Sequence, residues 1–407
     1  MMQKLPASPP TAAQLGLMQG DPVPSDRRVT LDRWQSWPWN RWSYQHIEEI
    51  IPCEPIVRSA RTSDLPPDPI ELGDVAFTTG AGECMRLDAF LDRTCTDGFL
   101  VLRGGRVVTE QYGNGMTPST RHLLQSVSKS VTGVLAGILT DRGELDPDAL
   151  LTGVIPELVG TSFEGATVRQ LLDMTTGTKF SEDYDDPESD ICRYEGAAGW
   201  RPRGPGDDDD LLQYVRGLRN HREHGDLFEY RSILTDLLGI VVERAGGDRF
   251  ARLTTGLLWA PLGAEADATI TVDRGGNPMT DGGVAMTLRD LARFGRLLLE
   301  GGVVSGRQVV SKDWIEDTRR ADEACRAAFA RSDSASRYPK GHYRNQWWVP
   351  DAEAGILLAA GIYGQFLYLD LQAQVAIAKV STLPFALDIE VSADHRRAFA
   401  AVVEAIG

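Results

Sequence analysis

The chain is poor in cysteine and in lysine. Only five of its 407 residues are cysteine, and no Cys-x-x-Cys pair occurs, which excludes a zinc knuckle and a thioredoxin-type motif. A chain of this length does not need disulfides, so we expect free thiols in a reducing compartment. Only six of the 42 basic residues are lysine, so a lysine within an apolar segment is an unusual choice.

Long hydrophobic runs and a secretory leader are also missing. No apolar stretch approaches the roughly 20 residues that span a bilayer, and the first 24 residues are broken by proline without an apolar core. The net charge of −16 disfavours nucleic acid and anionic membrane surfaces as partners. We therefore expect a cytoplasmic protein that acts on a small molecule, with a homodimer left open.

Strand patterns stand at both ends of the chain and helical patterns dominate its middle. A β-hairpin is predicted at 99–112 and strands at 345–350, 355–370 and 375–381, the last two pairing antiparallel. Helices are predicted at 46–51, 86–96, 125–140, 167–174, 208–219, 232–245, 287–300, 311–319 and 392–406. This order indicates an α+β fold with an antiparallel sheet flanked by helices and an inserted, mostly helical domain.

The same order suggests domain boundaries. Residues 1–30 form an extended arm, 31–165 and 287–407 form the α/β domain with the central sheet, and 166–286 form the mostly helical domain.

Two local clusters have alternative interpretations. The four tryptophans of residues 34–42 suit a ligand-stacking platform or, as we prefer, anchors that pin the arm to the body. The acidic run Asp207–Asp210 suits a metal site, but without a spaced partner residue it favours capping of the following helix.

The candidate chemistry centres on Ser126 and Lys129, which open the apolar helix predicted at 125–140. Residues three apart share a helical face. Burial and the positive helix end both disfavour an ammonium, so we expect a lowered lysine pKa and a neutral amine that acts as a general base. The Ser126 backbone N–H is a candidate oxyanion donor. The alternative is a capping serine and a solvated lysine on a surface helix.

Ser126-Val-Ser-Lys129 after a β-hairpin resembles the serine β-lactamase and penicillin-binding superfamily, which carries a Ser-x-x-Lys motif. A second motif of that superfamily is present as Tyr230-Arg-Ser232. The pair of motifs resembles class C β-lactamases, β-lactamase-fold carboxylesterases and 6-aminohexanoate-dimer (nylon oligomer) hydrolases. The resemblance implies that Tyr230 relays a proton between the serine, the lysine and the leaving group, with Ser232 in the substrate site.

The third superfamily motif, Lys/His-Thr/Ser-Gly on a strand, is altered to Ala359-Ala360-Gly361. In β-lactamases the cation and hydroxyl of this strand hold the carboxylate of the antibiotic, so their loss opposes β-lactam hydrolysis and D-Ala peptidase activity. The backbone role survives, and the N–H of Ile362 is the candidate second oxyanion donor, with a register open by one residue. Tyr363 follows as a candidate substrate contact.

The likeness to the nylon-oligomer hydrolases is the closest and runs over most of residues 30–400. It implies that Tyr184, in Glu-Asp-Tyr-x-Asp-Pro, closes over the substrate and that Trp200, in Ala-Gly-Trp, lines the cleft. It also places Glu195 against a substrate amine and Asp281 in the cleft, although both acids also suit solvated loops.

The sequence therefore predicts a serine hydrolase that cleaves short linear amides or small-acyl esters through an acyl-enzyme on Ser126, without a metal or an organic cofactor. Two alternatives stay open. One is a β-lactamase or D-Ala carboxypeptidase-like enzyme, and the other is a non-catalytic protein that keeps the penicillin-binding fold.

Overall fold

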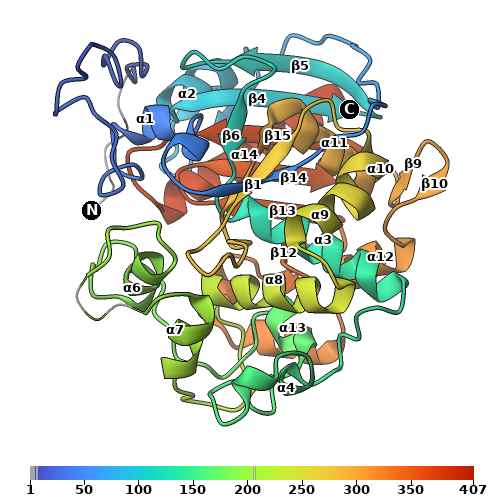
Figure 1. Ribbon diagram of the computed structural model, residues 1–407. Helices are drawn as coiled ribbons and strands as arrows, with labels where there is room; N and C mark the ends of the chain where they lie inside the picture. Colours follow the sequence, from blue (N-terminus) through green and yellow to red (C-terminus); the bar gives the residue numbers. More distant parts are fainter. Residues whose placement is uncertain (1–4, 6–7, 205, 207) are drawn as a thin grey trace.

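The computed structural model describes residues 5, 8–204, 206 and 208–407, and its centre is a seven-stranded antiparallel sheet (Figure 1). The strand order is β11-β12-β13-β14-β15-β4-β5. The strands are β4 Thr96–Arg103, β5 Arg106–Tyr112, β11 His342–Arg344, β12 Trp347–Asp351, β13 Ile356–Gly361, β14 Gln365–Asp370 and β15 Val375–Ser381. An early hairpin thus joins five strands from the end of the chain, which confirms the predicted antiparallel sheet.

One predicted strand is two strands. The run 355–370 folds into the hairpin β13–β14, because Tyr363 and Gly364 have φ values of +61° and +93° that end the extended conformation. The predicted antiparallel pairing with 375–381 is made by β14, whose Phe366 lies opposite Lys379 of β15.

Helices cover both faces of the sheet. On one face, α2 (Leu87–Arg93) and α14 (Ile389–Ile406) bury Phe90 and Phe399 against the strands. On the other face lie α3 (Val127–Asp141) and α11 (Leu288–Leu299), and α11 packs on β4 and β15. Because α3 carries the Ser126–Lys129 motif at its start, the site lies beside the sheet.

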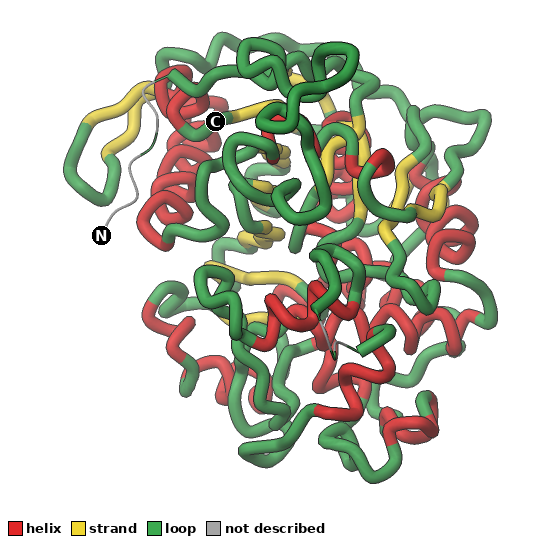
Figure 2. The backbone as a smooth tube through the Cα atoms, turned by 60° about the vertical axis from the view of Figure 1, so that its left-hand side comes forward, coloured by secondary structure: helices red, strands yellow, loops and turns green. Residues whose placement is uncertain are grey.

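Helices and loops make up the end of the molecule away from the sheet (Figures 1 and 2). Its centre is α8 (Ser232–Gly246), which packs on α3. The α-helices of the whole molecule that have not yet been named are α1 Asn40–Ser43, α4 Leu151–Val154, α5 Val168–Leu172, α6 Asp190–Ala197, α7 Leu211–Gly217, α9 Phe250–Thr254, α10 Ala260–Leu262, α12 Lys312–Arg320 and α13 Glu323–Ala330. Placing α8 against α3 brings Ser232 to the Ser126–Lys129 motif.

A second sheet, which the sequence patterns do not predict, has the order β1-β7-β8-β6. Its strands are β1 Cys53–Ile56, β6 Arg121–Leu123, β7 Ala268–Thr271 and β8 Val284–Thr287. Strands of three or four residues leave no periodic pattern to detect. The remaining strands form two hairpins, β2 Ala76–Thr78 with β3 Cys84–Arg86 and β9 Val303–Val304 with β10 Arg307–Gln308. Because β7 and most of β8 come from 166–286 and pair outside it, the proposed domain boundaries stay a prediction.

Two predicted helices differ from the structure. The segment 46–51 forms only a 3₁₀ turn at Ile47–Glu49, and 86–96 begins as the last residue of β3 before α2. Among the described residues, no helix is long and apolar enough to cross a bilayer.

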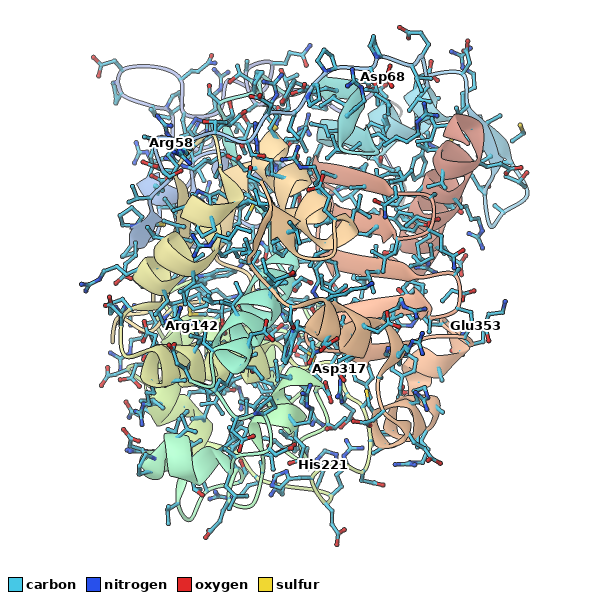
Figure 3. All side chains as sticks on the ribbon, turned by 90° about the vertical axis from the view of Figure 1, so that its right-hand side faces the viewer. Arg58, Asp68, Arg142, His221, Asp317 and Glu353 are labelled. Atoms are coloured by element: carbon cyan, nitrogen blue, oxygen red, sulfur yellow. The ribbon has the colours of Figure 1, made fainter. Side chains whose placement is uncertain are left out.

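A buried polar clamp joins the helical end to the sheet. Arg344 of β11 donates to Asp173 after α5 at 2.8 Å and to Asp317 of α12, labelled in Figure 3, at 2.7 Å. Two residues further on, the Gln346 carbonyl accepts from Ser130 of α3 at 2.8 Å, and its side-chain oxygen accepts from Thr235 of α8 at 2.8 Å. The clamp fixes the relative positions of α3 and α8.

Of the four tryptophans of residues 34–42, which we interpret as anchors, Trp34 is buried and the other three are half-buried. Trp34 is 1% exposed, and its indole N–H donates to the carbonyl of Trp200 at 2.7 Å. In the acidic run at 207–210, Asp210 caps α7 by accepting a hydrogen bond from the Gln213 N–H at 2.9 Å, while Asp207 lies outside the described residues. All five cysteines are free thiols.

Candidate active site

The predicted serine–lysine pair is formed at the start of α3. Ser126 is the N-cap residue, and the Lys129 ammonium donates to the Ser126 hydroxyl at 3.0 Å. The same nitrogen donates to the Ser232 hydroxyl at 3.0 Å and to the Asp281 carbonyl at 2.7 Å, which matches the three donors of an ammonium. Lys129 is 1% exposed, so the alternative of a solvated lysine on a surface helix is wrong.

The expected direction of the Lys129 pKa is wrong. Burial does lower this pKa, but electrostatic interaction with Tyr230 and with the carboxylates of Asp281 and Glu182 raises it, and the net pKa lies above the ordinary lysine value. The local argument from burial and the helix dipole missed acidic groups that long-range folding brings to the amine. Lys129 therefore rests as an ammonium at neutral pH.

Tyr230 lies at the same point, just before α8. Its ring centroid is 5.3 Å from the Lys129 nitrogen, and it stacks on Trp348 at 5.4 Å. Burial raises the pKa of Tyr230, whereas Lys129 and a hydrogen bond with Ser126 lower it, and the net pKa is raised. At neutral pH Tyr230 is a phenol in contact with both partners of the pair, a position suited to proton transfer.

The end of β13 approaches the nucleophile closely. A Cβ on Gly361 would stand 2.8 Å from the Leu124 carbonyl oxygen and 3.0 Å from the Ser126 nitrogen, so only glycine fits without a shift. The next residue, Ile362, lines the same pocket as Ser126. The two predicted oxyanion donors therefore come from adjacent backbone segments.

Gln365, which sequence reasoning missed, braces this turn. Its carboxamide donates to the carbonyls of Ser381 at 2.7 Å and Ile362 at 3.3 Å, and accepts from the Ser381 N–H at 3.0 Å. It is fully buried. No sequence signal marks it, because one partner, Ser381, lies on β15 and the other, Ile362, lies in the turn before β14.

A second residue missed by sequence reasoning, Glu182, supports Ser232. Its carboxylate accepts from the Ser232 N–H at 2.9 Å, from the Ser232 hydroxyl and from the Tyr184 hydroxyl at 2.8 Å. Burial raises the Glu182 pKa, opposed chiefly by the charge of Lys129. A continuous chain of hydrogen bonds thus runs from Ser126 through Lys129 and Ser232 to Glu182. The only available signal was its place two residues before Tyr184.

Two cavities meet at Tyr184, which lines both. The main pocket, of about 250 Å³, contains Ser126, Tyr230 and Ile362. The second pocket, of about 560 Å³, contains Trp200 and residues 31–37, which follow the arm. Tyr363 lines the second pocket as well.

Two predicted site residues lie behind the cavity surfaces. Glu195 is 5% exposed and already accepts from Arg201 and, at 3.1 Å, from Gln35. Asp281 is 8% exposed with a carboxylate oxygen 4.0 Å from the Lys129 nitrogen, and burial raises its pKa. Neither is a solvated loop charge. Contact of Glu195 with a substrate amine stays a prediction, because a cationic neighbour already balances its charge.

No group of three or more histidine, cysteine and acidic residues suited to a metal ion occurs in the part of the chain that the structure describes. The functional groups that the structure brings together are instead a hydroxyl, an amine and a phenol.

Comparison with known proteins identifies the family. The family model described as Beta-lactamase matches residues 89–402. The chain belongs to the beta-lactamase family. This hydrolase is 41% identical to the 6-aminohexanoate-dimer hydrolase of Paenarthrobacter ureafaciens, over 87% of this chain and 88% of that protein.

Solved structures agree with this assignment. A Bacillus anthracis protein that carries the provisional name 6-aminohexanoate-dimer hydrolase matches with a TM-score of 0.86 and 26% identity, covering 94% of this chain and 98% of that one. EstCE1, a hydrolase with promiscuous acyltransferase activity, shares the fold with a TM-score of 0.58 and 17% identity, covering 76% of this chain and 94% of its own. The predicted fold class and family are thereby confirmed.

Proposed function

We propose that this beta-lactamase-family hydrolase cleaves short linear amides or small-acyl esters through an acyl-enzyme on Ser126. The observation that carries the proposal is the 3.0 Å hydrogen bond from Lys129 to the Ser126 hydroxyl at the edge of a pocket that also contains Tyr230 and Ile362. The name of the 41% identical relative supports a linear amide of an amino acid as the substrate class.

In the proposed mechanism, the neutral form of Lys129 takes the hydroxyl proton as Ser126 attacks the carbonyl carbon. The N–H groups of Ser126 and Ile362 bind the oxyanion of the tetrahedral intermediate. Tyr230 then gives a proton to the leaving nitrogen or oxygen and is reprotonated from Lys129. Water hydrolyses the acyl-enzyme by the same groups in reverse order.

The strand beside the nucleophile disfavours β-lactams as substrates. Ala359 and Ala360 leave this part of β13 without a cation or hydroxyl. A β-lactam carboxylate would therefore lack its usual partners at that place, while a neutral carbonyl flanked by methylene groups needs none.

A substrate panel tests the proposal. The linear dimer of 6-aminohexanoate, p-nitrophenyl acetate and nitrocefin are each assayed with the wild type and with Ser126→Ala. We expect turnover of the first two compounds, at least a 1,000-fold loss of kcat in the variant, and little nitrocefin hydrolysis. Undiminished hydrolysis by Ser126→Ala would refute the acyl-enzyme.

A further inference from the structure

The main pocket contains two arginines that the catalytic mechanism does not use. Arg337 follows a 3₁₀ turn at Asp333–Ser336, and Arg396 lies on α14. Arg396 stands over the Tyr338 ring at 4.9 Å and contacts the Tyr338 hydroxyl and the Ser392 carbonyl, both at 3.4 Å. Among the described residues, no carboxylate lies within ion-pair distance of either guanidinium.

The two positive charges converge on one place. Burial raises the pKa of the Tyr338 hydroxyl, and the charges of Arg396 and Arg337 both act in the opposite direction. By contrast, the next arginine of α14, Arg397, points to an ordinary partner, since it donates to Asp394 at 2.7 Å. The pocket, which Glu182 also lines, thus holds two guanidinium groups without an ion-pair partner among the described residues.

An aromatic wall connects the nucleophile with these cations. Tyr230, which touches Ser126, stacks on Trp348 at 5.4 Å; Trp348 lies 5.3 Å from Tyr338; and Tyr338 lies 4.9 Å from the Arg396 guanidinium carbon. The pocket is also lined by apolar side chains, including Leu358, Ile362 and Phe366. Such a lining suits a methylene chain with polar groups only at its two ends.

We propose that Arg337 and Arg396 bind the terminal carboxylate of the leaving amine, so that the preferred substrates are amides of linear ω-amino acids. The inference rests on the proposed function and adds its leaving-group specificity. Tyr230 lines this pocket and protonates the leaving nitrogen in the proposed mechanism, so the amine half of the substrate is the half that lies in this pocket. Guanidinium groups are suited to this ligand, since their donors match the two oxygens of a carboxylate.

The dimensions leave room for an amine half of six carbons. An extended chain advances roughly 1.2 Å per bond, so a six-carbon ω-amino acid spans about 7–8 Å from nitrogen to carboxyl carbon. A guanidinium–carboxylate hydrogen bond adds about 3 Å. The distances from Tyr230 to Trp348, from Trp348 to Tyr338 and from Tyr338 to Arg396 limit the separation of the Tyr230 ring and the Arg396 guanidinium to at most roughly 16 Å. The length of the six-carbon chain with its hydrogen bond is below this limit.

Equilibrium binding tests the subsite without relying on turnover. Calorimetry with Ser126→Ala compares the linear dimer of 6-aminohexanoate with the same compound capped as a terminal carboxamide. We expect the carboxylate to bind about 10-fold more tightly, and Arg396→Gln or Arg337→Gln added to Ser126→Ala to remove most of this preference. Arg397→Gln is the matched control, because it changes a neighbouring arginine outside the pocket and should keep the preference.

Kinetics provide the second measurement. In the otherwise native enzyme, Arg396→Gln should raise KM for the carboxylate substrate about 10-fold, change kcat less than 2-fold, and leave the carboxamide substrate unaffected. Equal binding of the two ligands, no binding of either, or a preference that survives loss of both arginines would overturn the subsite. If the wild type hydrolyses neither compound while Ser126→Ala still discriminates between them, the proposed hydrolysis fails and the carboxylate subsite stands.

Discussion

Glu182 offers a direct test of how the neighbouring carboxylates control the pKa of Lys129. The Lys129 nitrogen lies 3.0 Å from the Ser232 hydroxyl, which in turn donates to Glu182, so the two charges are about 5 Å apart. At an effective dielectric constant of about 20, Coulomb's law gives roughly 3 kcal/mol. An attraction of this size favours the ammonium form of Lys129 and so raises its pKa.

We therefore expect Glu182→Gln to lower the Lys129 pKa. The base must be neutral, so kcat/KM of the wild type rises with pH toward the alkaline range, where the raised pKa of Lys129 lies. In the variant this rise moves to lower pH. The measurement is a pH profile of kcat/KM with p-nitrophenyl acetate, corrected for spontaneous hydrolysis.

Glu188→Gln is the matched control, because Glu188 lies on the same loop with a side chain 77% exposed and paired with Arg193. It should leave the profile where it is. Thermal melts of both variants separate a change in folding from a change in titration. A midpoint for Glu182→Gln that equals the wild-type value, or lies above it, would refute the electrostatic account of Lys129.

The structure also predicts the effects of substitutions at four other positions. Gln365→Leu should lower kcat at least 10-fold with little effect on KM in steady-state kinetics, because the braced turn carries an oxyanion donor. In Gly133→Ala the new Cβ would stand 2.1 Å from the Asn345 carbonyl oxygen, and the free energy of unfolding measured in urea should fall by about 3 kcal/mol. Gly153→Ala places its Cβ in open space and should leave the free energy of unfolding unchanged or raise it. Burial lowers the pKa of His342 to about 4. The unfolded chain therefore binds one more proton than the folded protein between about pH 6.5 and pH 4, and the free energy of unfolding falls as the pH drops through this range. His342→Gln should remove about 2 kcal/mol of the loss between pH 7 and pH 5, measured by thermal melts at the two pH values.

The proposed catalytic residues were within reach of sequence reasoning because their arrangement is local. Ser126 and Lys129 share one face of α3 at a spacing of three residues, and the resemblance added Tyr230 through a motif at the start of α8. Helices with a clear apolar period were found within a few residues of their observed bounds, as α8 and α11 illustrate. The second sheet escaped because short strands carry no such period.

Residues that act through long-range contacts could not be found in this way. Glu182 and Gln365 have ordinary sequence surroundings, and their roles follow from contacts with Ser232 and Ser381 on distant elements. The pKa of Lys129 was misjudged for the same reason, since the charges that raise it come from other parts of the chain. Buried electrostatics depend on the folded arrangement of charges more than on local pattern.

The position of positive charge in the main pocket separates this hydrolase from β-lactamase chemistry. A cation on β13 would bind a carboxylate that lies close to the scissile bond, as it does in a compact bicyclic substrate. This strand carries Ala359 and Ala360 at that place and therefore no cation. Arg396 instead lies over Tyr338 at the end of the aromatic wall, and Arg337 lines the same pocket. A carboxylate bound there is reached along the wall and not from β13. KM values measured across amides of four-, six- and eight-carbon ω-amino acids should therefore depend on the length of the amine half, and Arg396→Gln should remove that dependence; a series in which KM does not vary with length, or one in which Arg396→Gln keeps the variation, would contradict this assignment.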